Sequence, residues 1–120
     1  MARILLIDDT PEIAELLTFA LRDRGHEVFA TGYTTSVNEL LAEHQADALV
    51  LDCSGFDMSD TLFDSVREDA NYATLPVIII TDIAQQAEHV LRSRNAQNVL
   101  IVQKPFTAGQ VANALAQLLG

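Results

Sequence analysis

The stretch that decides the fold is Ile-Leu-Leu-Ile-Asp-Asp-Thr-Pro-Glu, residues 4–12. Its first four residues form an apolar run that is too short for a helix and stops at two aspartates. An apolar run without alternation is typical of a strand buried on both faces, as in a parallel sheet. Pro11 then stands where the first residue of a helix is expected, with Asp9 or Thr10 as its cap. We therefore predict a buried strand followed at once by a helix.

The same pairing of a strand with a helix recurs four more times along the chain. The later apolar runs stand at residues 28–30, 48–51, 77–80 and 99–102. The apolar stripes of the five helical patterns contain, in chain order, Leu17, Leu41, Phe63, Leu91 and Leu115. Gly25 is expected to end the first helix, and Thr107 to cap the fifth. This strict alternation predicts an α/β fold, a doubly wound parallel sheet of five strands written (βα)5.

Length, charge and cysteine content exclude several classes of protein. With 120 residues the chain is expected to form a single domain, residues 1–120. The 17 acidic against 7 basic side chains leave a net charge of −10, which argues against direct binding to nucleic acid or to an anionic membrane. The single cysteine, Cys53, excludes an internal disulfide and suits a reducing cytoplasm. No apolar run approaches the roughly 20 residues of a membrane span, so we expect a cytoplasmic protein.

Polar residues gather where the predicted strands end. Asp8 and Asp9 follow the first strand, Asp52 the third, Thr81 the fourth and Lys104 the fifth. In such a sheet, ligands bind at the carboxyl ends of the strands. Clustered carboxylates repel one another unless a cation joins them, and a hard divalent ion such as Mg²⁺ prefers their oxygens. A carboxylate, a metal, a hydroxyl and an ammonium group together favour phosphoryl transfer.

Each of these residues also has an ordinary structural interpretation. Asp9, Asp52 and Thr81 belong to residue types that cap helices and form turns. Lys104 and Pro105 suit a simple stop between a strand and a helix. The arrival of all five side chains at one edge of the predicted sheet favours a shared chemical role over separate structural ones.

The ordered set of motifs resembles the response-regulator receiver domains of two-component signalling. The similarity spans about residues 3 to 119 and is carried by residues 4–12, by Asp52 and Thr81 after their apolar runs, and by Lys104-Pro105-Phe106. The resemblance implies a flavodoxin-like receiver fold with strand order 2-1-3-4-5. It also implies a signalling domain that catalyses only its own phosphorylation and dephosphorylation, and not an enzyme acting on other substrates.

The resemblance further implies a role for each carboxylate. Asp52 would accept a phosphoryl group from the phosphohistidine of a sensor histidine kinase or of a phosphotransfer protein. Asp9, Asp52 and the backbone carbonyl of Ser54 would ligate Mg²⁺, for which Mn²⁺ can substitute. Asp8 would act through a metal-bound water.

The same resemblance implies how the site would switch. Lys104 would pair with a phosphoryl oxygen, and its peptide bond to Pro105 is expected to be cis. Thr81 would swing to donate a hydrogen bond to the phosphoryl group, which would shift a two-state equilibrium and reshape a protein-interaction surface. A downstream protein would read that surface, or a covalently linked effector domain if the chain is part of a longer protein.

Several positions depart from the family pattern. Ile101 occupies the position where the family usually has an aromatic switch residue, and Asp82 stands where a small residue is usual. Asp82 adds negative charge beside the predicted site, which disfavours an incoming phosphoryl group. Phe56 and Asp60 replace a usual proline and glycine, so the loop after the third strand is expected to differ in shape.

Three alternatives to a phosphorylated receiver differ in the residues that they require. A receiver-like interaction module with weak or lost phosphorylation, acting by constitutive protein docking, is compatible with Asp82 and Ile101. A phosphatase of the haloacid-dehalogenase type would need Asp-x-Asp after the first strand, where this chain has Asp8-Asp9-Thr10. A flavodoxin-like FMN binder would need a phosphate loop rich in Ser, Thr and Gly at the same place, where this loop is acidic. The site, and not the fold, separates these functions.

Overall fold

Five parallel strands alternate with five helices along the chain, as predicted. The computed structural model describes residues 2–52, 56–94 and 96–120. The strands are β1 (Arg3–Asp8), β2 (Glu27–Thr31), β3 (Ala48–Asp52), β4 (Val77–Thr81) and β5 (Val99–Gln103). The helices are α1 (Pro11–Asp23), α2 (Val37–Glu43), α3 (Phe56–Glu68), α4 (Ala84–Ser93) and α5 (Ala108–Leu119), with a short 3₁₀ helix, η1 (Ala70–Tyr72), before β4.

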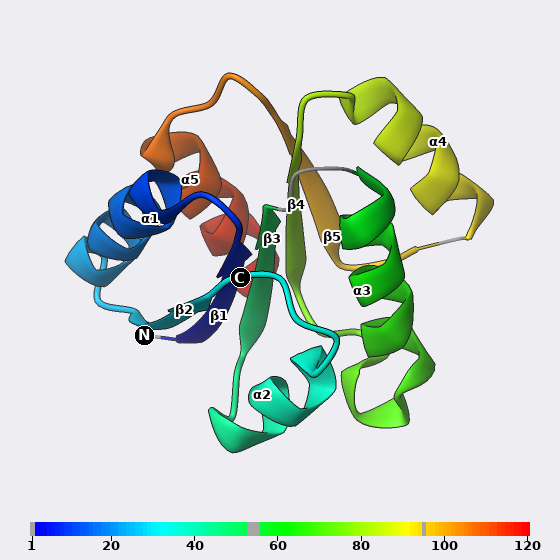
Figure 1. Ribbon diagram of the computed structural model, residues 1–120, viewed down its shortest axis with the longest axis horizontal. Coiled ribbons are helices and arrows are strands. Elements are labelled where there is room, and N and C mark those ends of the chain that lie inside the picture. The colour runs from blue at the N-terminus through cyan, green and yellow to red at the C-terminus, as the bar shows by residue number, and fades with distance from the viewer. Residues whose placement is uncertain (1, 53–55, 95) are drawn as a thin grey trace.

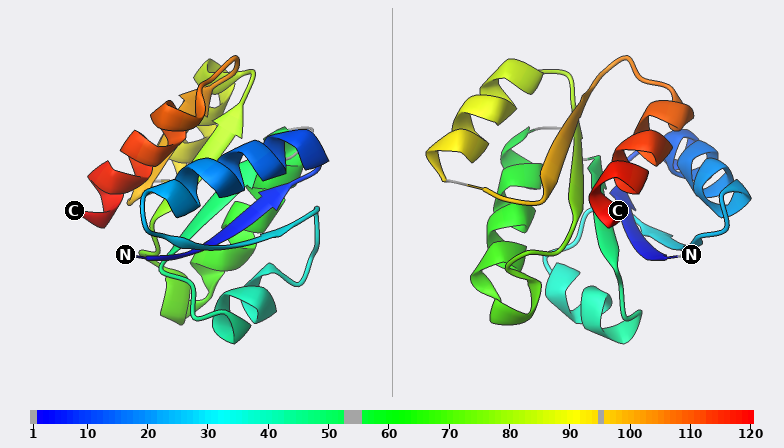
Figure 2. Two further views of the ribbon diagram at one scale, coloured as in Figure 1. Left: turned by 90° about the vertical axis from the view of Figure 1, so that its left-hand side faces the viewer. Right: turned by 180° about the vertical axis from the view of Figure 1, so that it is seen from behind.

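The strands form one sheet in the order β2-β1-β3-β4-β5, and every neighbouring pair is parallel. The order confirms the arrangement that the family resemblance implied. Helices α1 and α5 cover one face of the sheet, and α2, α3 and α4 cover the other (Figures 1 and 2). The carboxyl ends of all five strands consequently point to the same edge, which is the edge that the sequence marked with polar residues.

Two hydrophobic clusters, one on each face, hold the three layers together. Between α1, α5 and the sheet lie Leu6, Leu17, Leu21, Val50, Ile78, Val111 and Leu115. Between α2, α3, α4 and the sheet lie Leu5, Leu41, Leu51, Phe63, Val66, Ile79 and Leu91. Alternate residues of β1, β3 and β4 contribute to each cluster, which explains why these strands are apolar without alternation.

Strand β5 is less buried than its apolar sequence indicated. Among its residues only Val102 is fully buried, and Val99, Leu100 and Ile101 remain half-buried. The reason is topological, because β5 forms one edge of the sheet and has a strand neighbour, β4, on one side only. The prediction that every apolar run is buried on both faces is therefore wrong for this strand.

The ends of the helices match the sequence signals with one exception. Gly25, just beyond α1, has a φ of 90°, a conformation that glycine adopts without strain. Thr10 stands at the N-cap of α1, but no side chain caps that helix. The Thr10 N–H instead donates to Asp8 Oδ1 at 2.8 Å, so the expected cap from Asp9 or Thr10 is not formed.

Helix α5 begins with a complete capping box. The Gln110 N–H donates to Thr107 Oγ1 at 3.2 Å, and the Thr107 N–H donates to Gln110 Oε1 at 2.8 Å. We expect Thr107→Ala to lower the free energy of unfolding by about 1 kcal/mol, because a cap of this kind is worth about that amount. Urea unfolding measures the loss, and Thr107→Ser, which keeps the hydroxyl, is the control that should retain most of the stability.

Among the described residues, no helix combines the length and the apolar character that crossing a membrane requires.

Candidate functional site

Strand pairing brings the predicted acidic residues of β1 and β3 side by side. Asp8, the last residue of β1, is the register partner of Asp52, the last residue of β3. Thr81 ends β4. These three side chains are 3–5% exposed and are the only buried polar or charged residues in the part of the chain that the structure describes. Polar side chains with this degree of burial at strand ends need partners or a ligand.

Lys104 supplies the positive charge at this edge. Its Nζ lies 2.7 Å from Asp52 Oδ1, and the lysine side chain is 35% exposed against 3% for the aspartate. The Lys104 N–H donates to the Thr81 carbonyl at 2.8 Å, which ties the end of β5 to the end of β4. The Lys104–Pro105 peptide bond is cis, as the family resemblance implied. The ammonium group is thus held against Asp52, the carboxylate that the resemblance implies as the phosphoryl acceptor.

Asp8 is the least satisfied carboxylate of the site. Burial raises the pKa of Asp8 from 3.8 to about 7, the neighbouring Asp52 adds to the rise, and a hydrogen bond from the Thr10 N–H opposes it. Asp8 Oδ2 is buried and hydrogen-bonds to no described group. A buried oxygen without a donor, next to a second carboxylate, is the environment that a hard cation stabilises.

Asp9 is turned toward a different part of the molecule. Its side chain is exposed, and its Oδ1 accepts a hydrogen bond from the Tyr33 N–H at 3.2 Å. Among the described residues, no three His, Cys, Asp or Glu side chains form a group that could hold a metal ion. The structure therefore brings together Asp8 and Asp52, whereas the Asp9 side chain, which lies beyond the end of β1, contacts the backbone of Tyr33.

The remaining predicted site residues are placed as follows. Thr81 Oγ1 accepts a hydrogen bond from the Ile83 N–H at 3.1 Å, so the hydroxyl engages its own loop. Asp82 is exposed at the bend after β4. Ile101 is half-buried and packs against the cluster beneath α3 and α4. Ser54 lies outside the described residues, so its carbonyl ligand stays a prediction.

Phe56 and Asp60 were expected to give the loop after β3 a different shape from that of the family. Both residues lie in α3, which begins at Phe56. Residues 53–55, which include Cys53, lie outside the described part of the chain. The expected change in the shape of this loop therefore stays a prediction.

One residue of the site was missed at the sequence level. The Gln103 side chain accepts a hydrogen bond from the Ala84 N–H at 3.0 Å and donates to the carbonyls of Asp82 and Lys104 at 2.9 and 2.8 Å. The available signal was a lone amide at the end of an otherwise apolar strand, directly before Lys104. This side chain joins the loop after β4 to the loop after β5.

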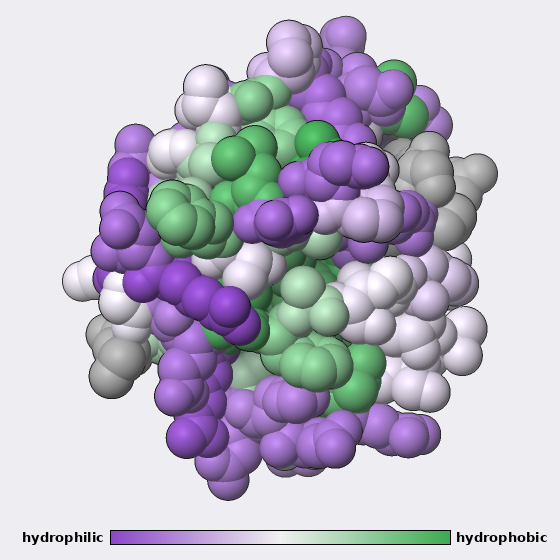
Figure 3. Space-filling model, turned by 60° about the vertical axis from the view of Figure 1, so that its left-hand side comes forward, coloured by the Kyte–Doolittle hydropathy of each residue, from purple (hydrophilic) through white to green (hydrophobic). Residues whose placement is uncertain are grey.

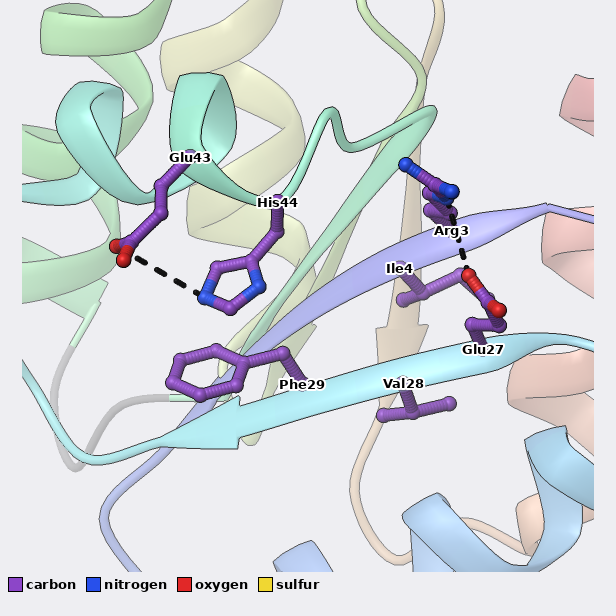
Figure 4. Close-up of a pocket in the computed structure, with 7 residues that line it drawn as sticks. All are labelled: Arg3, Ile4, Glu27, Val28, Phe29, Glu43 and His44. Atoms are coloured by element: carbon purple, nitrogen blue, oxygen red, sulfur yellow. Dashed lines mark hydrogen bonds and ion pairs between the residues drawn. The ribbon is translucent and has the colours of Figure 1, made fainter.

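A cavity of about 330 Å³ lies away from these residues, along the edge strand β2 (Figure 4). There the His44 ring stacks on Phe29 with a centroid separation of 3.9 Å, and Arg3 Nε pairs with Glu27 Oε2 at 3.0 Å. Arg3 and Glu27 open their strands, so this cavity extends to the end of the sheet opposite Asp52. No predicted site residue lines it.

Apolar side chains are also exposed on α1. Leu16 is 50% exposed and Phe19 is 73% exposed. In Figure 3, apolar surface appears over the face that α1 and β2 build, between hydrophilic side chains. Exposed apolar surface of this kind is common where one protein contacts another.

The sequence is similar to curated response regulators. It is 30% identical over 106 residues to the transcriptional regulatory protein KdpE of Mycobacterium tuberculosis, covering 88% of this chain and 46% of that protein. It is 30% identical over 99 residues to protein PilH of Pseudomonas aeruginosa, covering 78% of each. The chain spans about half the length of KdpE and of other transcriptional regulators that it matches.

Solved structures share the fold. The chemotaxis response regulator CheY4 of Vibrio cholerae superimposes with a TM-score of 0.83 at 19% identity, covering 98% of each chain. The receiver domain of the sensor histidine kinase PA1611 of Pseudomonas aeruginosa, whose structure holds a magnesium ion in the active-site cleft, gives 0.81 at 22% identity, covering 99% of this chain and 98% of that one. The family model of the response regulator receiver domain matches residues 4–116. This chain therefore belongs to the response regulator receiver domain family.

Proposed function

We propose that this chain takes a phosphoryl group from a phosphohistidine onto Asp52 and uses it as a signal. The observation that supports this most directly is the contact of 2.7 Å between Lys104 Nζ and the buried carboxylate of Asp52. An ammonium group in this position can turn to a phosphoryl oxygen once the carboxylate has become a mixed anhydride. The donor would be a sensor histidine kinase or a phosphotransfer protein.

The transfer follows from the groups that surround Asp52. A carboxylate oxygen of Asp52 attacks phosphorus, the P–N bond of the donor breaks, and the imidazole leaves with the electron pair of that bond. Lys104 stabilises the charge on the phosphoryl oxygens. The Thr81 hydroxyl, at the end of the neighbouring strand, donates a hydrogen bond to one of them after its contact with the Ile83 N–H has been given up.

The acidic pair fits a magnesium ion. Asp8 Oδ2 is a buried oxygen without a hydrogen-bond donor, and Asp52 adjoins it in the sheet register. We propose that Asp8, Asp9 and Asp52 hold Mg²⁺, with the carbonyl of Ser54 as a further ligand and with Mn²⁺ as a substitute, and that Asp9 turns away from Tyr33 to do so. When bound, the ion neutralises charge on the phosphoryl oxygens and on the carboxylates.

In the proposed signalling role, one protein partner would deliver the phosphoryl group and another would bind the switched surface. The exposed side chains of Leu16 and Phe19 on α1 offer apolar contact area for such a partner. A net charge of −10 disfavours a direct nucleic-acid partner for this part of the chain. Intact-mass spectrometry after incubation with a small phosphodonor and Mg²⁺ tests the proposal, because one phosphoryl group must then appear on Asp52.

Asp82 is expected to slow this reaction. It is exposed and directly follows Thr81, so its charge lies beside the approach of an anionic donor. We expect Asp82→Ala to accelerate phosphorylation by acetyl phosphate about two- to fivefold at low salt, with the gain shrinking as ionic strength rises.

Glu68→Ala is a matched control for the charge change. It also removes one exposed carboxylate, but from the end of α3, at the opposite end of the sheet. The initial rate of phosphoprotein formation, followed by mass, should stay at the wild-type value in this variant. An equal acceleration in both variants would mean that net charge, and not the position of Asp82, controls the rate.

A further inference from the structure

The Gln103 side chain holds together the two loops that carry the reactive groups. Its Oε1 accepts from the Ala84 N–H at 3.0 Å, and its Nε2 donates to the Asp82 carbonyl at 2.9 Å and to the Lys104 carbonyl at 2.8 Å. Asp82 belongs to the loop that follows Thr81, Ala84 is the first residue of α4, and Lys104 begins the loop that follows β5. Both loops leave the same edge of the sheet (Figure 1). One exposed amide thus uses both of its donor hydrogens and its acceptor oxygen on main-chain groups.

The loop after β4 is therefore held from two sides. On the inner side, Thr81 Oγ1 accepts from the Ile83 N–H at 3.1 Å. On the outer side, Gln103 holds the residues before and after Ile83, namely Asp82 and Ala84. Thr81 and Gln103 are also direct register partners in the sheet. Any movement of Thr81 that pulls on Ile83 must consequently strain or break the contacts of Gln103.

No other side chain of β5 can make this connection. The strand reads Val-Leu-Ile-Val-Gln, so Gln103 is its only residue with a polar side chain. Ile101 packs against the cluster under α3 and α4 and has no hydrogen-bonding group. Among the side chains of β5, only the amide of Gln103 can therefore hydrogen-bond to the loop after Thr81.

We propose that Gln103 is a positioning residue for the phosphoryl reaction. The hydrogen bonds of its amide, here called the clasp, hold residues 82–84 in the arrangement that keeps the Thr81 hydroxyl on the Ile83 N–H. The inference rests on the proposed function. The clasp opposes the turn of Thr81 toward a phosphoryl group on Asp52, and the bound phosphoryl group must supply the free energy that opens it. Removing these hydrogen bonds therefore lowers the free energy of the switched conformation relative to the resting one. Any ligand that binds the switched conformation should then bind more tightly.

The test uses beryllium fluoride with Mg²⁺, a tetrahedral analogue of the phosphoryl group that coordinates to a carboxylate oxygen. Gln103→Met keeps the length of the side chain and removes all three hydrogen bonds. We expect it to bind the analogue about three- to tenfold more tightly than the wild type. The gain is modest because the lost hydrogen bonds are exposed and each stabilises the resting conformation only weakly. Gln117→Met is the matched control, because it makes the same chemical change at an exposed position on α5; its affinity should equal that of the wild type.

The Thr81→Ala background separates a positioning role from a merely structural one. If Gln103 acts through Thr81, Gln103→Met changes the affinity for beryllium fluoride in the wild-type background and leaves it unchanged in Thr81→Ala. The rate of amide hydrogen exchange in the ligand-free protein is a second, independent measurement. Exchange at Ala84 and Ile83 should quicken in Gln103→Met, and it should stay slow in Gln117→Met.

The outcomes are distinguishable. Tighter binding that disappears in the Thr81→Ala background supports the inference. If the wild type binds the analogue and Gln103→Met binds it equally or more weakly, the proposed role of Gln103 is wrong and the proposed function stands. The same gain in both backgrounds also overturns the proposed role, because Gln103 would then act without Thr81. A wild type that binds no analogue would defeat the proposed function, and the inference with it.

Discussion

Asp52→Asn is expected to remove phosphorylation completely. Incubation with acetyl phosphate and Mg²⁺ should add about 80 Da to the wild type, one phosphoryl group, and should add nothing to the variant. An amide oxygen at this position is a far weaker nucleophile than a carboxylate and cannot form an acyl phosphate. The substitution also removes the partner of Lys104 Nζ, which lies 2.7 Å from Asp52 Oδ1 in the wild type. Intact-mass spectrometry distinguishes the two species directly.

The design of this experiment includes a second donor and a matched variant. Phosphoramidate carries a P–N bond, as phosphohistidine does, and should modify the wild type at the same residue. Asp82→Asn makes the same chemical change at an exposed position one residue past β4, and it should still gain the phosphoryl mass. A gain of mass by Asp52→Asn would exclude Asp52 as the acceptor. A wild type that neither donor modifies would favour the alternative of a receiver-like interaction module that docks constitutively.

Asp8→Asn is expected to raise the melting temperature of the metal-free protein and to abolish its response to Mg²⁺. The physical reason is the juxtaposition of Asp8 and Asp52 at the ends of adjacent strands, both nearly fully buried, with Asp8 Oδ2 lacking a donor. Replacing one carboxylate by a neutral amide relieves repulsion and supplies donors. At about 1 kcal/mol, the gain would raise the melting temperature by roughly 4 °C for a chain of this length.

The response to metal is the second half of the same prediction. In the wild type, Mg²⁺ at roughly ten times its dissociation constant should stabilise the fold by about 1.4 kcal/mol. The corresponding rise in melting temperature should be about 4 to 6 °C. Asp8→Asn should show little of this rise, because it has lost one anionic oxygen donor of the site. Differential scanning calorimetry at pH 8, with and without Mg²⁺, measures both effects.

Glu88→Gln serves as the control for the removal of a negative charge. Glu88 is exposed in the middle of α4, so its substitution should leave both the metal-free melting temperature and the Mg²⁺ response unchanged. If the melting temperature of the wild type responds to neither Mg²⁺ nor Mn²⁺, the proposed metal site is wrong. If Asp8→Asn lowers the metal-free melting temperature, the carboxylate stabilises the fold and the argument from repulsion fails.

Much of the site could be predicted from the chain because it lies at the ends of strands. An apolar run ending in a polar residue is a local pattern, and it located Asp8, Asp52 and Thr81 correctly at the last positions of β1, β3 and β4. Parallel pairing then required these ends to meet at one edge. The cap from Thr107 was predictable for the same reason, since it depends on a few consecutive residues, whereas the cis bond before Pro105 was implied by the family resemblance.

Other features could not be predicted because they depend on residues far apart in the chain. Asp9 accepts a hydrogen bond from the backbone of Tyr33, 24 residues away. The contacts of Gln103 with Ala84 and Asp82 span 19 and 21 residues. The half-exposed character of β5 follows from its place at the edge of the sheet, and that place is a property of strand order.

The sequence by itself determined the elements, their alternation, and the chemical groups delivered to one edge of the sheet. The apolar runs, the cap from Thr107 and the strand-end aspartates are patterns of contiguous residues, and local sterics and hydrophobicity are enough to interpret them. Only the tertiary structure decided which of those groups touch: Lys104 against Asp52, Asp9 against Tyr33, and Gln103 across two loops. Such contacts depend on strand order and on the course of loops, because a side chain of a few ångströms can reach only what the packing of distant segments brings beside it.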